Sequence, residues 1–225
     1  MLADYQTIVS ELVRDDGGKI SPAERDRAIA AAVMRYSKDR PRTKVEDVTP
    51  ESSQLLPLPA SWEAGFSDVV ALEHPKGRVP PVHLKPERVA LYSDPAGTKI
   101  MLLDHVAVAT DSVRASFTVA HQVDAQIDTV PAADREAVAC WAAASLCDQL
   151  AAFYSSGTDS TIQADAVDGR SKAQEYSARA KTLRVRYHNE LGIDFKKAAP
   201  AGAVVNLDFP DSRGQDRLTH PARYR

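Results

Sequence analysis

Three histidines are the residues whose placement could support metal chemistry. His83, His105 and His121 lie in segments that could form strands, and imidazole nitrogens are common ligands of zinc. Such a site needs the three rings to converge and further groups to orient them. Single histidines in strands are more often ordinary hydrogen-bonded residues, so we expect neither a bound metal nor any other cofactor.

A hydrolytic site is the second chemistry to consider, because Asp104 directly precedes His105, and Ser112 and Ser116 follow closely. Neighbouring residues of a strand point to opposite faces, which places Asp104 poorly for orienting His105. The patterns GxxxxGKS or GxxxxGKT, GxGxxG, HExxH and GxSxG, typical of phosphate-binding loops, zinc proteases and nucleophile elbows, do not occur. We therefore expect that the protein is not an enzyme.

Two cysteines lie in the almost wholly apolar stretch AVACWAAASLCDQLAAFY, residues 137–154. On one helix Cys140 and Cys147 would be about 10.5 Å apart along the axis, which is too far for a disulfide. A membrane span needs roughly 20 predominantly apolar residues, and alanine, which is only weakly hydrophobic, supplies much of this stretch. We interpret it as a packing helix, whose small residues let neighbouring helices approach closely.

A basic stripe recurs every seven residues in the second half of the chain, at Lys172, Arg179 and Arg186. The simplest interpretation is a solvated helix face. Contact with an acidic surface of another subunit is the alternative that gives these residues a function, and direct contact with phosphate is a third possibility.

The elements that position these residues begin with a helical hairpin at 1–40. Apolar residues recur at helical spacing from Leu2 to Val13, and DDGG at 15–18 ends that helix. Ser21, Pro22 and Glu24 form the start of a second helix, with a capping box. That helix should end before Pro41.

A β-rich module is predicted at 60–128, after a stretch rich in proline and polar residues at 40–60 that suits an extended linker. Its expected strands are FSDVVALE, RVALY, TKIMLLDHVAVA and SVRASFTVAHQV. In the last strand, apolar residues alternate with polar ones from Val113 to Val123, with His121 on the apolar face. That alternation indicates a half-buried antiparallel strand.

A long helical hairpin at 129–192 should complete the helical core. Its first helix begins near Pro131 and ends at SSG, and its second follows STIQADAVDG and stops at Gly192. The predicted fold is therefore α+β. It has a four-helix core with two N-terminal helices and two long C-terminal ones packed together, an inserted antiparallel β module, and an extended C-terminal arm at 193–225.

Composition limits the class of protein. A chain of 225 residues with 44% hydrophobic and 26% charged residues can bury a core, and a net charge of -3 argues against a free-standing nucleic-acid binder. MLADYQTIVSEL has no basic region before its apolar residues, so it is not typical of a signal peptide, and we expect an intracellular protein. The arm keeps several apolar and basic residues, which favours docking onto another subunit over a solubilising role.

The order of these elements resembles the head-to-tail adaptor, or connector, proteins of tailed bacteriophages. The likeness covers most of the chain, and its most characteristic part is TVPAADREAVACWAAASLCDQLAAFYSS followed by ADAVDGRSKAQEYSARAK and YHNELG. The β insert opened by PASWEAGFSDVVALEHPKGRVPP is a matching but less specific feature. The plain helical adaptors of this class lack so large an insert, so the resemblance leaves the position of the chain in the neck open.

The resemblance implies a structural protein of the virion neck, made in the cytoplasm of the host bacterium. Such adaptors form rings, commonly of twelve copies, between the portal protein and a tail, stopper or terminator protein, with a channel for passing DNA and no membrane contact. Residues 193–225 would be the portal-binding arm. Its candidate contact residues are Val204, Val205, Leu207, Phe209, Arg213, Arg217, Arg223, Tyr224 and Arg225.

In such a ring, the helices would form the subunit contacts, with Lys172, Arg179 and Arg186 as candidates, and the β insert would be a variable module. A net negative subunit would leave a DNA channel weakly charged, so that the polyanion slides. Two other classes stay open: a hydrolase or metal-dependent enzyme using the β module, and a small monomeric binding protein.

Overall fold

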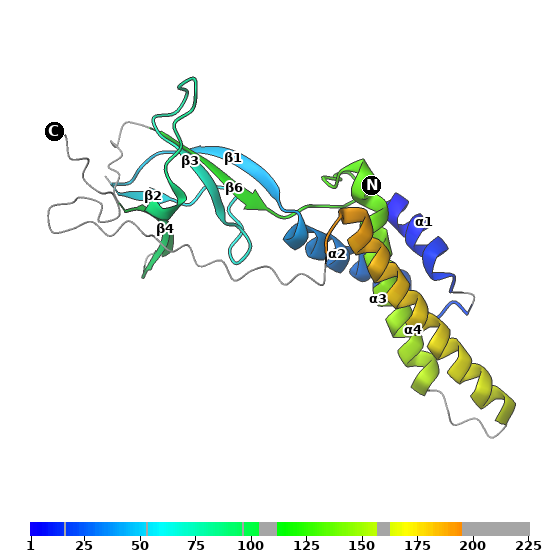
Figure 1. The fold of residues 1–225 in the computed structure, drawn as a ribbon. Coiled ribbons are helices and arrows are strands. Elements are labelled where there is room, and N and C mark those ends of the chain that lie inside the picture. Colours follow the sequence, from blue (N-terminus) through cyan, green and yellow to red (C-terminus); the bar gives the residue numbers. More distant parts are fainter. Residues whose placement is uncertain (16, 53, 96, 104–111, 157–162, 195–225) are drawn as a thin grey trace, which may run out of the picture. The chain divides into compact units, whose positions relative to one another are not determined.

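The computed structural model describes residues 1–15, 17–52, 54–95, 97–103, 112–156 and 163–194. These residues form two compact units (Figure 1). Among the described residues, the helical unit contains Met1–Lys44, Ser61–Asp68 and the chain from Phe117 to Asp194, and the β unit contains Val45–Ala60 and Val69–Ser116. The described part thus has the predicted α+β fold, with helices before and after an inserted β region.

The two N-terminal helices begin and end as the sequence predicts. α1 spans Leu2–Val13 and ends at Arg14, whose φ of 51° is left-handed. α2 spans Pro22–Asp39 and starts with the predicted capping box. The Ser21 amide donates to a Glu24 carboxylate oxygen at 2.8 Å, and the Glu24 amide donates to Ser21 Oγ at 3.3 Å. A bond of 2.6 Å from Gln6 Nε2 to Asp26 Oδ1 links the two helices.

The C-terminal pair is longer than the first. A 3₁₀ turn at Ala132–Asp134 leads into α3, Arg135–Ser156, and α4 spans Gln163–Leu191. Gly192 follows with a φ of 65°, which confirms the predicted stop. α4 begins several residues earlier than expected from its apolar seam. α3 packs against α4 along much of its length and also contacts α1 and α2.

The core of the helical unit surrounds α3. Its buried residues include two consecutive runs, Ala137–Cys140 and Ala142–Ala144, followed by Leu146, Cys147 and Leu150. A helix that is buried on consecutive residues is covered on more than one side. The predicted packing helix is confirmed.

The same helix passes a test for a membrane span on length and composition alone. Within Ala132–Ser155, 56% of the most apolar stretch is buried inside the protein. Its partners are Tyr5, Ile29, Tyr36 and Leu183, all buried in the same cluster. The apolar character of α3 is therefore accounted for by its position at the centre of a helical core.

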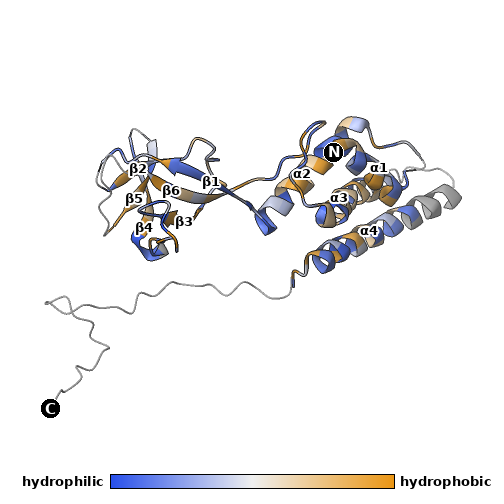
Figure 2. Ribbon diagram, turned by 90° about the horizontal axis from the view of Figure 1, so that it is seen from above, coloured by the Kyte–Doolittle hydropathy of each residue, from blue (hydrophilic) through white to orange (hydrophobic). Residues whose placement is uncertain are grey.

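Six strands form two small sheets in the described part of the chain. In the first, the order is β1 (Arg42–Val48), β6 (Val113–Val119), β3 (Val69–Glu73). In the second, the order is β2 (Leu55–Pro57), β5 (Gly97–Leu102), β4 (Val89–Asp94), and both pairings are antiparallel. A 3₁₀ turn at Pro86–Arg88 precedes β4. Figure 2 shows hydrophobic and hydrophilic residues interspersed along these strands.

Residues 40–60 are not the linker that their prolines suggested, because β1 and β2 lie within them. β1 alternates half-buried and exposed residues, and exposed Asp47 forms ion pairs with Arg114 of β6 and with Lys76, each at 3.0 Å. Most of the prolines flank the two strands. Pro57 lies within β2, but β2 is an edge strand, where a missing N–H is tolerated.

β6 follows the predicted alternation. Val113, Ala115, Phe117 and Val119 are buried, while the residues between them are half-buried. Of the other predicted strands, β3 lies inside FSDVVALE, whereas β4 extends past RVALY to Asp94 and β5 begins at Gly97, so the predicted SDPAG turn is shorter than expected; residues 104–111 lie outside the described residues.

Candidate functional site

The basic stripe of α4 is engaged within the helical unit. Arg179 donates an N–H to the carbonyl of Val13 at 2.8 Å, and its guanidinium lies over the Tyr176 ring. Val13 is the last residue of α1, so Arg179 satisfies a carbonyl at the negative end of that helix. Arg179 therefore links α4 to the C-terminal end of α1.

The other two cations of the stripe make different contacts. Arg186 pairs with Glu136 of α3 and with Glu190 of α4, the latter at 2.7 Å. Lys172 lies 5.6 Å from the centre of the Tyr154 ring, and Tyr154 stacks on Tyr176. These contacts leave Arg186 accessible to another subunit, because 44% of its side-chain surface stays exposed. The stripe therefore joins α4 to its neighbours and still presents charge to solvent.

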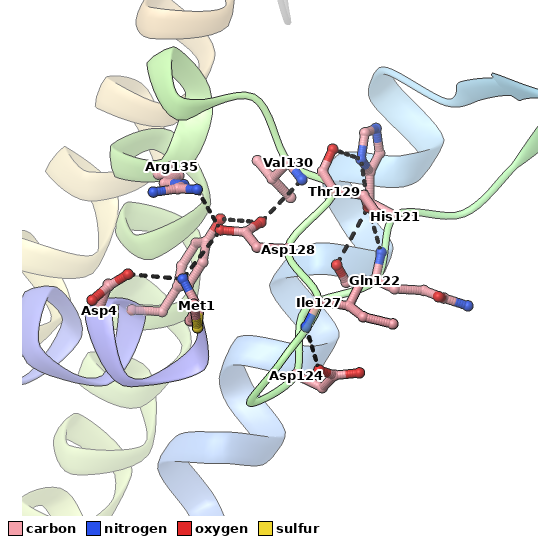
Figure 3. A network of polar contacts seen from close by, with 11 residues as sticks. Met1, Asp4, His121, Gln122, Asp124, Ile127, Asp128, Thr129, Val130 and Arg135 are labelled. Carbon is pink, nitrogen blue, oxygen red and sulfur yellow. Dashed lines mark hydrogen bonds and ion pairs between the residues drawn. The ribbon is translucent and has the colours of Figure 1, made fainter.

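A polar network fixes the chain where it enters α3 (Figure 3). Its centre is Asp128, whose side chain is only 6% exposed. Arg135 pairs with this carboxylate at 2.9 Å, the amine of Met1 lies at 3.3 Å, and the amide of Val130 donates to it at 3.0 Å. The Tyr5 hydroxyl lies 3.5 Å away, and burial beside Asp128 raises its pKa.

A second carboxylate lies at the same end of the helical unit. The Tyr36 hydroxyl donates to Asp134 at 2.6 Å, and Arg40 pairs with the same oxygen at 2.9 Å. Burial and Asp134 raise the pKa of Tyr36, which stays a neutral donor. Arg40 also donates to the carbonyl of Leu191 at 2.6 Å, so it caps the C-terminus of α4 as Arg179 caps that of α1.

His121 is a packed structural residue. Its Nδ1 lies 2.9 Å from the carbonyl oxygen of Thr129, and its Nε2 lies 3.1 Å from the carbonyl oxygen of Arg40. Its amide donates to Ser37 Oγ, and its ring contacts Tyr36 at 4.9 Å. The residue thus holds together the place where the chain leaves the helical unit after α2 and the place where it returns.

The three histidines considered for a metal are not gathered by the described structure. His121 belongs to the helical unit, His83 forms a bridge to Glu73 in the β unit, and His105 lies outside the described residues, as does Asp104. Across the described ranges, no three histidine, cysteine, aspartate or glutamate side chains are grouped as metal ligands.

Cys140 and Cys147 are free and fully buried. Burial raises the pKa of each thiol to about 11. Both are therefore small core residues of α3, as their spacing predicted.

The predicted arm contacts, from Val204 to Arg225, lie outside the described residues. Sequence reasoning missed Asp128, Asp134 and Arg40, which determine how the helices meet. The position of Asp134 in the first turn of a helix is a signal for a dipole contact. Asp128 combines the nearby partners Arg135 and Val130 with Met1 and Tyr5, which lie over a hundred residues away and could not be foreseen. In comparisons with known proteins, neither a family model nor a curated protein matches the chain.

Proposed function

We propose that this chain is the subunit of an adaptor ring in the neck of a tailed bacteriophage, placed between the portal and the tail. The proposal rests on the resemblance in element order and on one feature of the helical unit. In the described part of α4, one face is packed, mainly against α3 and also against α1 and α2, through Ala180, Leu183, Tyr187 and Leu191. The opposite face, around Val185, is exposed among the described residues, and we propose that a second subunit covers it.

That outer side has the mixed character of a subunit contact. Lys181, Thr182 and Asn189 are exposed there, and Val185 keeps 44% of its surface exposed among them. Arg186 and Glu190 lie on the same helix and already form an ion pair. A neighbouring copy could cover Val185 and extend this charge pattern without separating α4 from α3.

A ring also needs a subunit frame that does not change shape when neighbours dock. The described contacts supply it: alanines and cysteines fill α3, and Arg40 and Arg179 bind the last carbonyls of α4 and α1. Under the proposal, residues 193–225 bind the portal and the β unit is the variable module facing capsid or tail.

The test is electron cryomicroscopy of the chain mixed with the portal protein of the same phage. Three versions are compared: the full chain, a chain ending at Gly192, and a matched control in which residues 193–225 are scrambled at constant composition. The expected result is rings on the portal with the full chain alone. If none of the three versions associated with the portal protein, the proposed function would be ruled out.

The ring contact is tested separately with Val185→Asp. Because Val185 is half exposed, the isolated subunit should keep its melting temperature, whereas ring formation on the portal should be lost. Met34→Asp, at an apolar residue of α2 that is 46% exposed, is the matched control and should leave the rings intact. Unchanged rings with the aspartate variant would show that this side of α4 is not the contact.

A further inference from the structure

We propose that the free edge of β4 pairs with β4 of a second copy of this chain, about a twofold axis through Leu91, to give a continuous six-stranded sheet. This inference concerns the β unit and does not depend on the neck function. Within the described part of the chain β4 ends its sheet, which has the order β2, β5, β4.

The hydrogen-bonding register shows which groups face outward. β4 pairs with β5 so that Ala90 lies opposite Met101 and Tyr92 opposite Lys99, and the Leu103 amide donates to the Arg88 carbonyl at 2.9 Å. Hydrogen-bonded and non-hydrogen-bonded pairs alternate in an antiparallel ladder, so the residues between these, Val89, Leu91 and Ser93, direct their N–H and C=O groups away from β5.

This edge has few of the features that keep a strand edge unpaired. VALYSD contains no proline, no lysine and no bulge, and its central residues Leu91 and Tyr92 are 48% and 42% exposed. Natural edge strands usually carry charges or proline that prevent further pairing. β4 carries one charge, Asp94, at its end.

An apolar row crosses this sheet and ends at the same place. Leu56 of β2, Ile100 of β5 and Leu91 of β4 lie directly opposite one another, so their side chains share one face. Leu56 and Ile100 are completely buried, whereas Leu91 is half exposed. A strand added beside β4 with an apolar residue opposite Leu91 would continue the row.

β4 itself meets that requirement. When two copies pair antiparallel with Leu91 opposite Leu91, Val89 of each copy faces Ser93 of the other. These three outward-directed pairs make roughly six main-chain hydrogen bonds, two for each pair. The row then becomes Leu56, Ile100 and Leu91 followed by the same three residues in reverse order.

Charge complementarity fixes the same register. With Leu91 on the axis, Arg88 of one copy lies opposite Asp94 of the other at both ends of the pairing. These positions are non-hydrogen-bonded across the new seam, where opposite Cα atoms are only about 4.5 Å apart and cross-strand charges interact best. A slip of one residue would place Leu91 of one copy opposite Tyr92 of the other. The apolar faces of the two sheets would then lie on opposite sides, and both ion pairs would be lost.

The experiment is disulfide trapping in the full chain. Leu91→Cys places two thiols opposite each other on the axis, where a Cα separation of about 5.5 Å permits a disulfide. The natural cysteines are buried and do not compete. We expect the Leu91→Cys chain to form a disulfide-linked species of twice its 24.4 kDa mass on non-reducing gels.

The matched control is Ser93→Cys, which is also exposed and lies on the same edge and the same face. In the proposed register its two copies lie roughly 13 Å apart, so it should not crosslink alone, whereas a mixture with Val89→Cys should give the heterodimer. Equal crosslinking by Leu91→Cys and Ser93→Cys, or none by Leu91→Cys, would overturn the proposal.

A second measurement needs no crosslink. Leu91→Pro removes an N–H that β5 does not use, so the fold should persist by circular dichroism, while light scattering should show the mass falling from dimer to monomer. Crosslinking at position 91 that appears only after truncation at Gly192 would mean that the chain's own arm covers the edge, and the proposal would be wrong.

Discussion

Single residues in the helical unit carry interactions whose loss can be measured. Asp128 is the sharpest case, because its buried carboxylate serves Arg135, the Val130 amide and the Met1 amine together. Asp128→Asn keeps the shape but removes the negative charge. We expect a loss of about 1–3 kcal/mol in the free energy of unfolding, measured by urea denaturation.

Asp124→Asn is the matched control in the same loop. Asp124 accepts hydrogen bonds from the amides of Gln126 and Ile127, and an asparagine oxygen can accept the same bonds. It should change stability much less than Asp128→Asn. Equal effects of the two substitutions would mean that charge at Asp128 is not what stabilises the loop.

Ala144 tests the packing of α3. Its side chain is fully buried, so Ala144→Phe should destabilise the protein by about 1–3 kcal/mol through overpacking. Ala152→Phe, at an exposed position of the same helix, should stay within about 0.5 kcal/mol. A melting temperature that falls equally in both variants would contradict the packing described.

The cysteines give a chemical readout of the same core. With a thiol pKa of about 11, roughly a thousandth of each cysteine is thiolate at pH 8, and burial blocks access as well. Native protein should react with a disulfide reagent at least roughly a hundredfold more slowly than protein in 8 M urea. The reason is that each thiol can react only after local unfolding exposes it. Similar rates in both conditions would place the cysteines at the surface.

The properties of single residues that depend on the local sequence pattern were predicted well. Burial of Ala144, the spacing of the cysteines and the apolar face of β6 all follow from periodicity. It did not predict that Arg179 would cap α1, because the partner carbonyl is 166 residues away and a main-chain acceptor leaves no mark on the side-chain pattern.

Among the helices and strands, α2 is the one whose start is determined most completely by its own local sequence. The pKa of Glu24 is held below its ordinary 4.5, first by the Ser21 hydroxyl and then by the Ser21 amide. A lowered carboxyl pKa stabilises the fold above the ordinary pKa, and this contribution is lost as pH falls through the lowered value. The capping box should therefore act at neutral pH and fail in acid.

Ser21→Ala measures this at the level of the helix. We expect a loss of about 1 kcal/mol at pH 7, when the hydroxyl that binds the Glu24 amide is removed, and a smaller loss below pH 4. Thermal unfolding at both pH values checks it. If the loss of unfolding free energy in Ser21→Ala were the same at both pH values, the contribution of the cap would not depend on the ionisation of Glu24.

β1 and β2 show where element prediction fails. In RPRTKVEDVTPESSQLLPLPA the prolines and charges indicate a loop, yet RTKVEDV forms a strand because β6 lies beside it in the sheet and Arg114 binds the exposed Asp47. Strand formation here depends on a partner about seventy residues later, which no local window contains. The candidate ring face around Val185 was not predicted, because the sequence marked only the basic stripe Lys172, Arg179 and Arg186 on this helix.

At the scale of the whole molecule, the division into two units predicts that stability is not uniform. Leu72 is fully buried in the β unit. Leu72→Ala should cost about 2–5 kcal/mol there and raise amide exchange in β3 to β5 far more than in α1 and α3. Hydrogen exchange followed by mass spectrometry checks this, and an equal increase in both units would show one cooperative domain.

Both tryptophans belong to the helical unit, since Trp62 lies in Ser61–Asp68 and Trp141 in α3. Tryptophan fluorescence therefore follows that unit, and a change confined to the β unit has to be measured by exchange or by Tyr92. The Leu72→Ala comparison should accordingly leave the fluorescence transition nearly in place.

The hydrogen bond between His121 Nε2 and the Arg40 carbonyl has a consequence for how such proteins diversify. At 3.1 Å it ties the residue that follows α2 to the chain that leads into α3. Because Ser61–Asp68 also belongs to the helical unit, changes in length are best accommodated within Val45–Ala60 and Val69–Ser116, away from the contacts of the helices. Related chains would therefore share this helical frame and differ most in the length of the β unit.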